Sequence, residues 1–369
     1  MPSVRTASAP PSVPNAVASA SATGAASLAP VDWTRRVHPA AALAAVILLL
    51  MPLIANDFIL FQIFSWSFIL GMIALSLMFL AGYGGMVSVA QMTIAGFAGY
   101  MVSIFGVSGV AAVSLGWPWW LAAPTAIVLA TLFGTITGAL AVRTAGIYTI
   151  MITLAIAAAF FYFVNQNYAI FNGHTGINSV ATPKFWDVDW RAPVPFYYVT
   201  LGFAALSLWA ASYLSRAPFG LALQGVRDNP RRMAALGFNV NAHRVAAYVF
   251  ASIVASIAGI LLVWSNGQIS PGTVSVDAAI DILVIAVVGG ISRPIGPFIG
   301  SLIYVILRTF ALDFLVAVGL DGNRFRLLVG FGFLVIVFWS PDGVTGLWQR
   351  WSNRGRGSQN TAPRGGGHG

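Results

Sequence analysis

Long apolar runs separated by short polar breaks dominate the hydrophobic pattern of this chain. A membrane-spanning helix needs about 20 apolar residues, or fewer where it is short or broken. The stretches that meet this criterion are 39–55, 58–81, 86–107, 118–141, 147–165, 195–214, 245–265, 278–291, 295–312 and 324–340. The pattern therefore predicts an all-α integral membrane protein with about ten transmembrane helices, some of them short or broken.

The two ends of the chain lack this pattern. Residues 1–38 are mostly Ala, Ser and Pro without periodicity, so we expect a disordered cytoplasmic segment. Residues 343–369 are rich in Gly and Arg and predict a disordered basic cytoplasmic tail close to anionic lipid. Residues 39–342 between them then form one polytopic domain.

Composition restricts the chemistry that the chain can carry. Hydrophobic residues are 58% of the chain and charged residues 8%, far below the quarter that is usual in soluble domains. The single lysine, Lys184, lies in ATPKFW and not in a phosphate-binding loop, so any ATP hydrolysis must come from another chain. There is no cysteine, and the four histidines lack ligand spacing, so we expect neither a metal site nor a catalytic residue.

Basic residues fix the expected orientation. A cytoplasmic N-terminus leaves only five of the nineteen on or near the outside, namely Lys184, Arg191, Arg308, Arg324 and Arg326. The opposite orientation would reverse this bias and violate the positive-inside rule. The same distribution explains the net charge of +9 without nucleic-acid binding.

Residues 216–244, here called the basic segment, interrupt the apolar pattern. The segment is longer than a simple connection between two spanning helices requires. The segment carries five arginines and one acid, Asp228. Asn229 or Asp228 can cap a short helix that begins at Pro230, and Gly237 can end it. Arg231 and Arg232 near its start oppose the helix dipole, which favours a role in docking a partner. The alternative is a positive-inside loop with an incidental helix.

Polar and glycine residues inside the spans are sparse. Glycines allow either close helix packing or a break that exposes backbone groups to a transport pathway, and both interpretations stay open. Asp277 and Asp281 share one helix face, where Asp277 is expected to cap and Asp281 lies one turn deeper. The candidate pathway residues are Gly82, Gly84, Gly85, Ser88, Gln91, Asp281, Gly289 and Gly290.

Three separated stretches resemble the permeases of branched-chain amino-acid ABC importers, the LivH/LivM family, on the LivM side. The first is GYGGMVSVAQMTIAGFAGY (82–100). The second is FGLALQGVRDNPRRMAALGFNVNAHRVAAYVFASIVASIAGILL (219–262), and the third is ISPGTVSVDAAIDILVIAVVGGISRPIGPFIGSLI (269–303). With the order of the spans, the resemblance covers about residues 40–345.

The resemblance implies a permease subunit in the bacterial inner membrane with both termini cytoplasmic. Its implied partners are a LivH-like second permease, two ATP-binding subunits that hydrolyse ATP-Mg, a periplasmic or lipid-anchored solute-binding protein and membrane lipid. The implied substrate is a branched-chain amino acid or a related small solute. Urea or a short amide, and an ion-coupled secondary transporter, stay open as alternatives. The residues matching the family's ATPase-coupling region are Arg227, Asp228, Asn229, Pro230, Arg231, Arg232, Ala235 and Gly237.

Overall fold

The computed structural model describes residues 39–111, 113–144, 146–185 and 188–317. The predicted disordered ends (1–38 and 343–369) and the last predicted span (324–340) lie outside these residues. The chain divides into two units, one ending at Met51 and one beginning at Pro52. In the first unit, α1 is an apolar helix over Pro39–Leu50. A short 3-10 turn, η1, over Met51–Leu53 spans the division.

The regular structure in the described part of the second unit is almost entirely helical, which confirms the predicted all-α class. A very short antiparallel pair, β1 (Lys184–Phe185) and β2 (Val188–Asp189), is the exception. The longer helices are α2 (Trp66–Met78), α3 (Gln91–Phe105), α4 (Trp119–Ala141), α5 (Ile147–Gln166), α7 (Pro193–Arg216), α8 (Pro218–Asp228), α10 (Val240–Asn266), α11 (Val276–Gly289) and α12 (Gly296–Ala317). The shorter pieces are η2 (Ile59–Ser65), η3 (Phe79–Tyr83), α6 (Tyr168–Phe171), η4 (Gly173–Thr175), α9 (Pro230–Ala235) and η5 (Pro271–Val274).

Each span predicted between residues 58 and 312 coincides with a helix. Among the described residues, five helices are long and apolar enough to cross a membrane: Ile59–Tyr83, Trp119–Ala141, Ile147–Gln166, Pro193–Arg216 and Val240–Asn266. The helices α3 and α12 contribute shorter apolar stretches. The predicted start at residue 86 is five residues too early, because the chain stays non-helical from Gly84 to Ala90.

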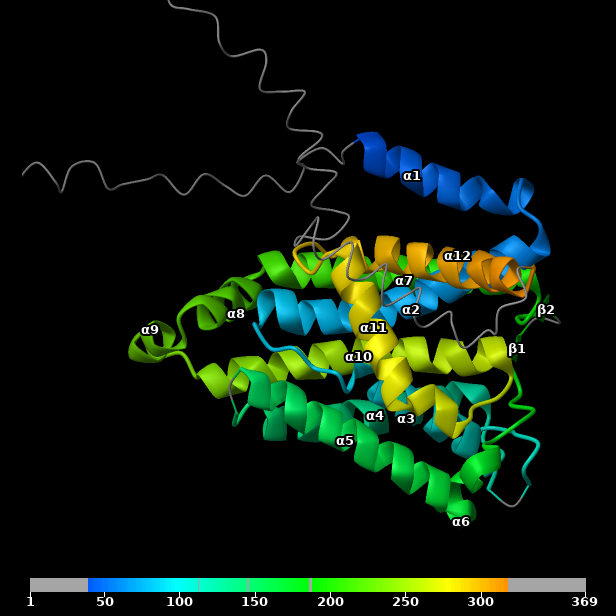
Figure 1. Cartoon of the computed structure of the whole chain (residues 1–369), viewed down its shortest axis with the longest axis horizontal. Helices are drawn as coiled ribbons and strands as arrows, with labels where there is room; N and C mark the ends of the chain where they lie inside the picture. Colours follow the sequence, from blue (N-terminus) through cyan, green and yellow to red (C-terminus); the bar gives the residue numbers. More distant parts are fainter. Residues whose placement is uncertain (1–38, 112, 145, 186–187, 318–369) are drawn as a thin grey trace, which may run out of the picture. The chain divides into compact units, whose positions relative to one another are not determined.

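The helix Ile59–Tyr83 forms the centre of this unit. It runs without interruption through η2, α2 and η3, and nearly all its side chains from Ser65 onward are buried. The helices α10 and α12 both pack on α2, and α10 also packs on α3 and α4 (Figure 1). An apolar helix that is buried on every side is typical of the core of a helix bundle.

A glycine lets α10 and α3 cross closely. A Cβ atom on Gly259 of α10 would overlap the carbonyl oxygen of Ala95 on α3. Small residues at such crossings let two backbones approach and gain van der Waals contact, which is how helices associate in lipid.

The bundle has two distinct ends. In Figure 1, α8 and α9 lie at the left, beyond the first residues of α10, whereas β1 and the last residues of α10 lie at the right. Because α10 has 27 residues, about 40 Å separates its ends. The basic segment therefore lies far from the loop that connects α10 with α11.

Candidate functional site

The helix break after η3 is the first candidate site. Residues Gly84 to Ala90 are not helical, and Gly85 has a φ of +67°, which glycine adopts without the steric cost that other residues meet. The backbone amide of Met86 donates a hydrogen bond to the carbonyl oxygen of Leu80, with 3.0 Å between nitrogen and oxygen, and this bond fixes the turn. The sequence left open whether these glycines serve close packing or a break, and the chain is not helical here.

Arg227 of α8 connects the basic segment to this break. Its Nη1 donates a hydrogen bond to the carbonyl oxygen of Gly82, and its Nε lies 2.8 Å from Oδ1 of Asp228. A Cβ atom on Gly85 would lie only 2.6 Å from Cγ of Arg227. Residues that are 145 positions apart in sequence therefore form one junction, hereafter the Arg227 junction, which consists of Gly82, Gly85 and Arg227.

The second glycine region lies beside the same junction. A Cβ atom on Gly82 would overlap the carbonyl oxygen of Ile291, directly after Gly289 and Gly290. Gly289 itself packs against the backbone of Gly296 at the crossing of α11 and α12. The two regions thus approach each other, and in this conformation their glycines serve close packing.

Ser88 lies in the break and Gln91 is the first residue of α3, and both are fully buried. The hydroxyl of Ser76 on α2 donates to Oε1 of Gln91 at 3.1 Å, and the amide of Val89 donates to Oγ1 of Thr153 at 3.2 Å. These bonds attach the break to α2 and α5. Because neither side chain is exposed, a pathway through Ser88 and Gln91 requires a different conformation from this one.

The basic segment folds into two helices. Asn229 caps α9, since its Oδ1 accepts from the amide of Arg232 at 3.0 Å, and Pro230 is the first helical residue. Gly237, with a φ of +89°, ends the turn that follows. The sequence therefore predicted α9 correctly, but α8 before it was not predicted as a separate helix.

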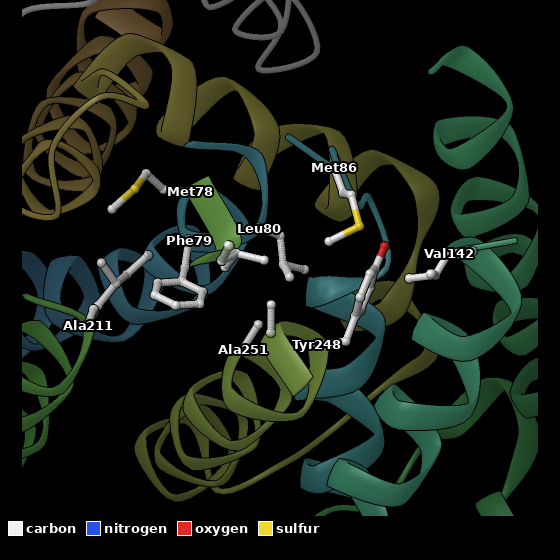
Figure 2. Close-up of a cluster of buried hydrophobic side chains, with 12 residues drawn as sticks. Met78, Phe79, Leu80, Met86, Val142, Ala211, Tyr248 and Ala251 are labelled. Atoms are coloured by element: carbon white, nitrogen blue, oxygen red, sulfur yellow. The ribbon is translucent and has the colours of Figure 1, made fainter. Parts of the chain in front are cut away.

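The helix α8 is fixed to the bundle by apolar contacts. Leu223 belongs to a buried cluster with Leu80, Met86 and Tyr248. Figure 2 shows this cluster, in which the ring of Tyr248 stands between Met86 and Val142. Removing Leu223 from water stabilises the position of α8 by roughly 1.5–3 kcal/mol. In contrast, α9 has no buried residue.

Asp281 lies in a different place, in a cavity of about 300 Å³ beside the start of α11. The elements that line it are α2, α3, the end of α10, the loop before α11, α11 and α12. The polar residues of its lining are Asn266, Ser270, Thr273, Ser275, Asp277, Asp281, Tyr304 and Arg308. We call this space the Asp281 cavity.

The expectation that Asp277 caps α11 is wrong. The cap is Ser275, whose Oγ accepts from the amide of Ala278 at 3.2 Å. Asp277 lies within the first turn, where its charge still stabilises the helix dipole. Ser275 has the extended backbone of a capping residue. The sequence alone did not show whether Ser275 or Asp277 is the cap.

A family comparison identifies the class of protein. Residues 59–338 match the family model described as the branched-chain amino acid transport system, permease component. The chain belongs to this family. Together with the five apolar helices, membership makes the chain a multi-pass membrane protein.

Two relatives from this permease family illustrate the similarity. The chain is 22% identical over 296 residues to the high-affinity branched-chain amino acid transport system permease protein LivM of Escherichia coli, covering 74% of this chain and 64% of that protein. It is 26% identical over 231 residues to the probable branched-chain amino acid transport permease protein LivM of Methanocaldococcus jannaschii, covering 59% and 67%. The match thus spans less than two thirds of the Escherichia coli protein. No solved structure matches the chain.

Sequence reasoning about this permease missed Arg308. In the sequence, Arg308 was interpreted only as one of the basic residues near the outer boundary. In the structure it lines both the Asp281 cavity and an adjoining cavity of about 320 Å³. A charged residue inside an apolar helix was the available signal, since such residues usually face a cavity or a partner. What the sequence lacked was the position of α12 beside α11.

Proposed function

We propose that the chain is a membrane-spanning permease subunit of an ABC importer that moves branched-chain amino acids, or a related small solute, inward. In this proposal ATP-Mg is hydrolysed on separate cytoplasmic subunits, while this chain binds no cofactor and catalyses no reaction. Family membership supports the proposal, as do the LivM relatives. So does the sequence, whose single lysine does not lie in a phosphate-binding loop.

The observation that carries the proposal is the Arg227 junction. An exposed helix, α9, follows α8, which is fixed in the bundle. Arg227, near the end of α8, donates a hydrogen bond to the carbonyl oxygen of Gly82, just before the break of the central helix. Movement imposed on α9 by a partner would thereby reach the break directly. Such a mechanical link suits a transporter whose energy source is another subunit.

The proposed partners follow from the same argument. A second, LivH-like permease would complete the pathway, two cytoplasmic ATP-binding subunits would contact the basic segment, and a periplasmic or lipid-anchored solute-binding protein would deliver the solute. The complex would lie in the bacterial inner membrane with both termini of this chain cytoplasmic. The coupling residues remain those from Arg227 to Gly237.

Uptake by vesicles tests the energy source. Reconstituted vesicles that hold all subunits should take up labelled leucine only when they contain ATP, because hydrolysis on the partner drives the movement. Depleting ATP while ion gradients are held constant should stop uptake. The matched control replaces the P-loop lysine of the ATP-binding subunits, which should abolish uptake at full ATP. Sustained uptake without ATP would instead favour an ion-coupled secondary transporter.

A further inference from the structure

A buried aromatic ring lies beside the helix break. Tyr248 of α10 is fully buried, and its ring stands between Met86 of the break and Val142, which directly follows α4 (Figure 2). We propose that Tyr248 is a gate residue, whose ring closes the transport pathway at the break in this conformation. The inference rests on the proposed transport function, to which it adds one residue that controls passage.

The ring of Tyr248 is tightly packed. A Cβ atom on Gly138 of α4 would overlap Cγ of Tyr248, so the glycine makes room for the ring. Leu80, just before the break, and Leu223 of α8 belong to the same buried cluster as Tyr248. Side chains packed in this way leave no space for a solute between them. The ring therefore blocks the region between the break, α4 and α8.

The polar groups next to the ring lack good hydrogen-bond partners. The hydroxyl of Tyr248 faces that of Ser88 in the break. Neither hydroxyl, nor Nε2 of Gln91, has a partner of good geometry among the described residues. A buried polar group without a partner costs stability, so packing alone would favour apolar residues at these positions. A second conformation, in which the break opens to water or solute, would supply partners for all three groups.

The position of Tyr248 along α10 places the gate near the basic segment. Tyr248 lies eight residues after Val240, the first residue of α10, which corresponds to about 12 Å along the helix axis. Because Leu223 of α8 packs in the same cluster as the ring, movement imposed on the basic segment would reach the gate. A partner that moves α8 could thus open and close the break.

Tyr100 provides a matched control for loss of packing. Its ring lies on α3, is also fully buried, and carries a hydroxyl that likewise lacks a hydrogen-bond partner among the described residues. It packs on Phe171, with 5.2 Å between ring centroids, and is not a member of the cluster around Tyr248. Replacing either tyrosine with alanine removes the same atoms, so a role in packing alone predicts equal effects.

Cysteine modification tests whether the ring seals the break, because the chain has no native cysteine. Ser88→Cys places a thiol in the break. In resting full complexes in nanodiscs, a methanethiosulfonate reagent should modify this thiol slowly. Adding Tyr248→Ala should raise the rate about tenfold, because the cavity left by the ring closes only in part. Tyr248→Phe, which keeps the ring, and Tyr100→Ala should leave the rate within about twofold of the parent.

Coupling tests whether the sealed break is part of the pathway. A gate that cannot close lets solute flow back, so Tyr248→Ala should lower the leucine accumulated for each ATP hydrolysed about tenfold. Tyr248→Phe and Tyr100→Ala should keep the ratio of the parent. Where Tyr248→Ala does not assemble, Tyr248→Leu takes its place in both measurements.

The outcomes separate a gate from a structural ring. Equal modification rates or equal coupling for Tyr248→Ala and Tyr100→Ala would overturn the proposal. A loss in Tyr248→Phe as large as that in Tyr248→Ala would also overturn it, because the ring is then not the barrier. The modification rate is measured without ATP or transport, whereas uptake by the parent complex is measured separately. A failed transport function is thereby distinguished from a failed gate.

Discussion

At the scale of single residues, Gly85 and Arg227 depend on each other. Gly85 occupies a left-handed conformation, and its missing side chain leaves room for the stem of Arg227. Arg227 uses that room to reach the carbonyl oxygen of Gly82. The guanidinium is partly exposed, so its ion pair with Asp228 adds little stability and the position of the arginine is what matters.

We predict that Gly85→Ala lowers the solute transported for each ATP hydrolysed. The added methyl group meets Cγ of Arg227 and also strains the backbone at positive φ, at a cost of about 1–2 kcal/mol. The measurement is leucine uptake and ATP hydrolysis in the same vesicles. A fall in the ratio with intact assembly is the expected result.

Gly116→Ala is the matched control for this prediction. Gly116 has a φ of +69°, close to that of Gly85, but no atom lies within 4 Å of the Cβ atom it would gain. It therefore shares the backbone strain without the contact. If both variants lose coupling equally, strain and not the Arg227 junction is responsible, and the argument fails.

At the scale of elements, α8 and α9 differ in how they meet the bundle. One face of α8 buries Ala222, Leu223 and Val226, whereas α9 buries nothing. Met233 of α9 approaches Gly225 of α8, so the two helices still touch. An anchored helix followed by an exposed one presents its arginines to whatever lies beyond the membrane surface.

Charge reversal tests that presentation. Arg231→Glu with Arg232→Glu should weaken binding of the ATP-binding subunits about tenfold, because two attractive contacts become repulsive. Affinity is measured on purified subunits, and hydrolysis stimulated by the loaded binding protein should fall with it. Membrane insertion should stay normal.

The control carries the same change in charge elsewhere. Arg143→Glu with Arg293→Glu alters two exposed arginines that lie outside the basic segment. It should leave the affinity within about twofold of the parent, as is usual for charges outside a contact. Equal weakening by both pairs would show that net charge, and not the face of α9, controls binding.

At the scale of the whole molecule, the two candidate sites lie at opposite ends of α10. The basic segment ends within its first two turns, and the loop that lines the Asp281 cavity follows its last residue. The positive-inside rule predicts that the first end is cytoplasmic, and we therefore expect the cavity to open toward the outside.

Cysteine labelling of intact cells tests this orientation. Leu236 and Leu115 are both exposed, and each can carry the single cysteine of the chain. A membrane-impermeant reagent should label Leu115→Cys in spheroplasts, but should label Leu236→Cys only after the membrane is permeabilised. The reverse pattern would contradict the predicted orientation and put the Asp281 cavity on the cytoplasmic side.

The sequence alone determined the features that depend on neighbouring residues. The positions of the spans follow from the length of each apolar run, and α9 follows from Asn229, Pro230 and Gly237, which act within one or two turns. Local sequence did not decide which residue caps α11, because Ser275 and Asp277 are both acceptable capping residues and lie only two positions apart.

Only the tertiary structure decided which distant groups meet. No local pattern in the chain pairs Arg227 with Gly82, 145 residues away, or sets Arg308 of α12 on the same cavity as Asp281 of α11. These pairings depend on the order in which helices pack and on glycines that let backbones approach. The sequence therefore determined the spans and the short helix α9, while packing between helices determined the Arg227 junction and the charged cavity.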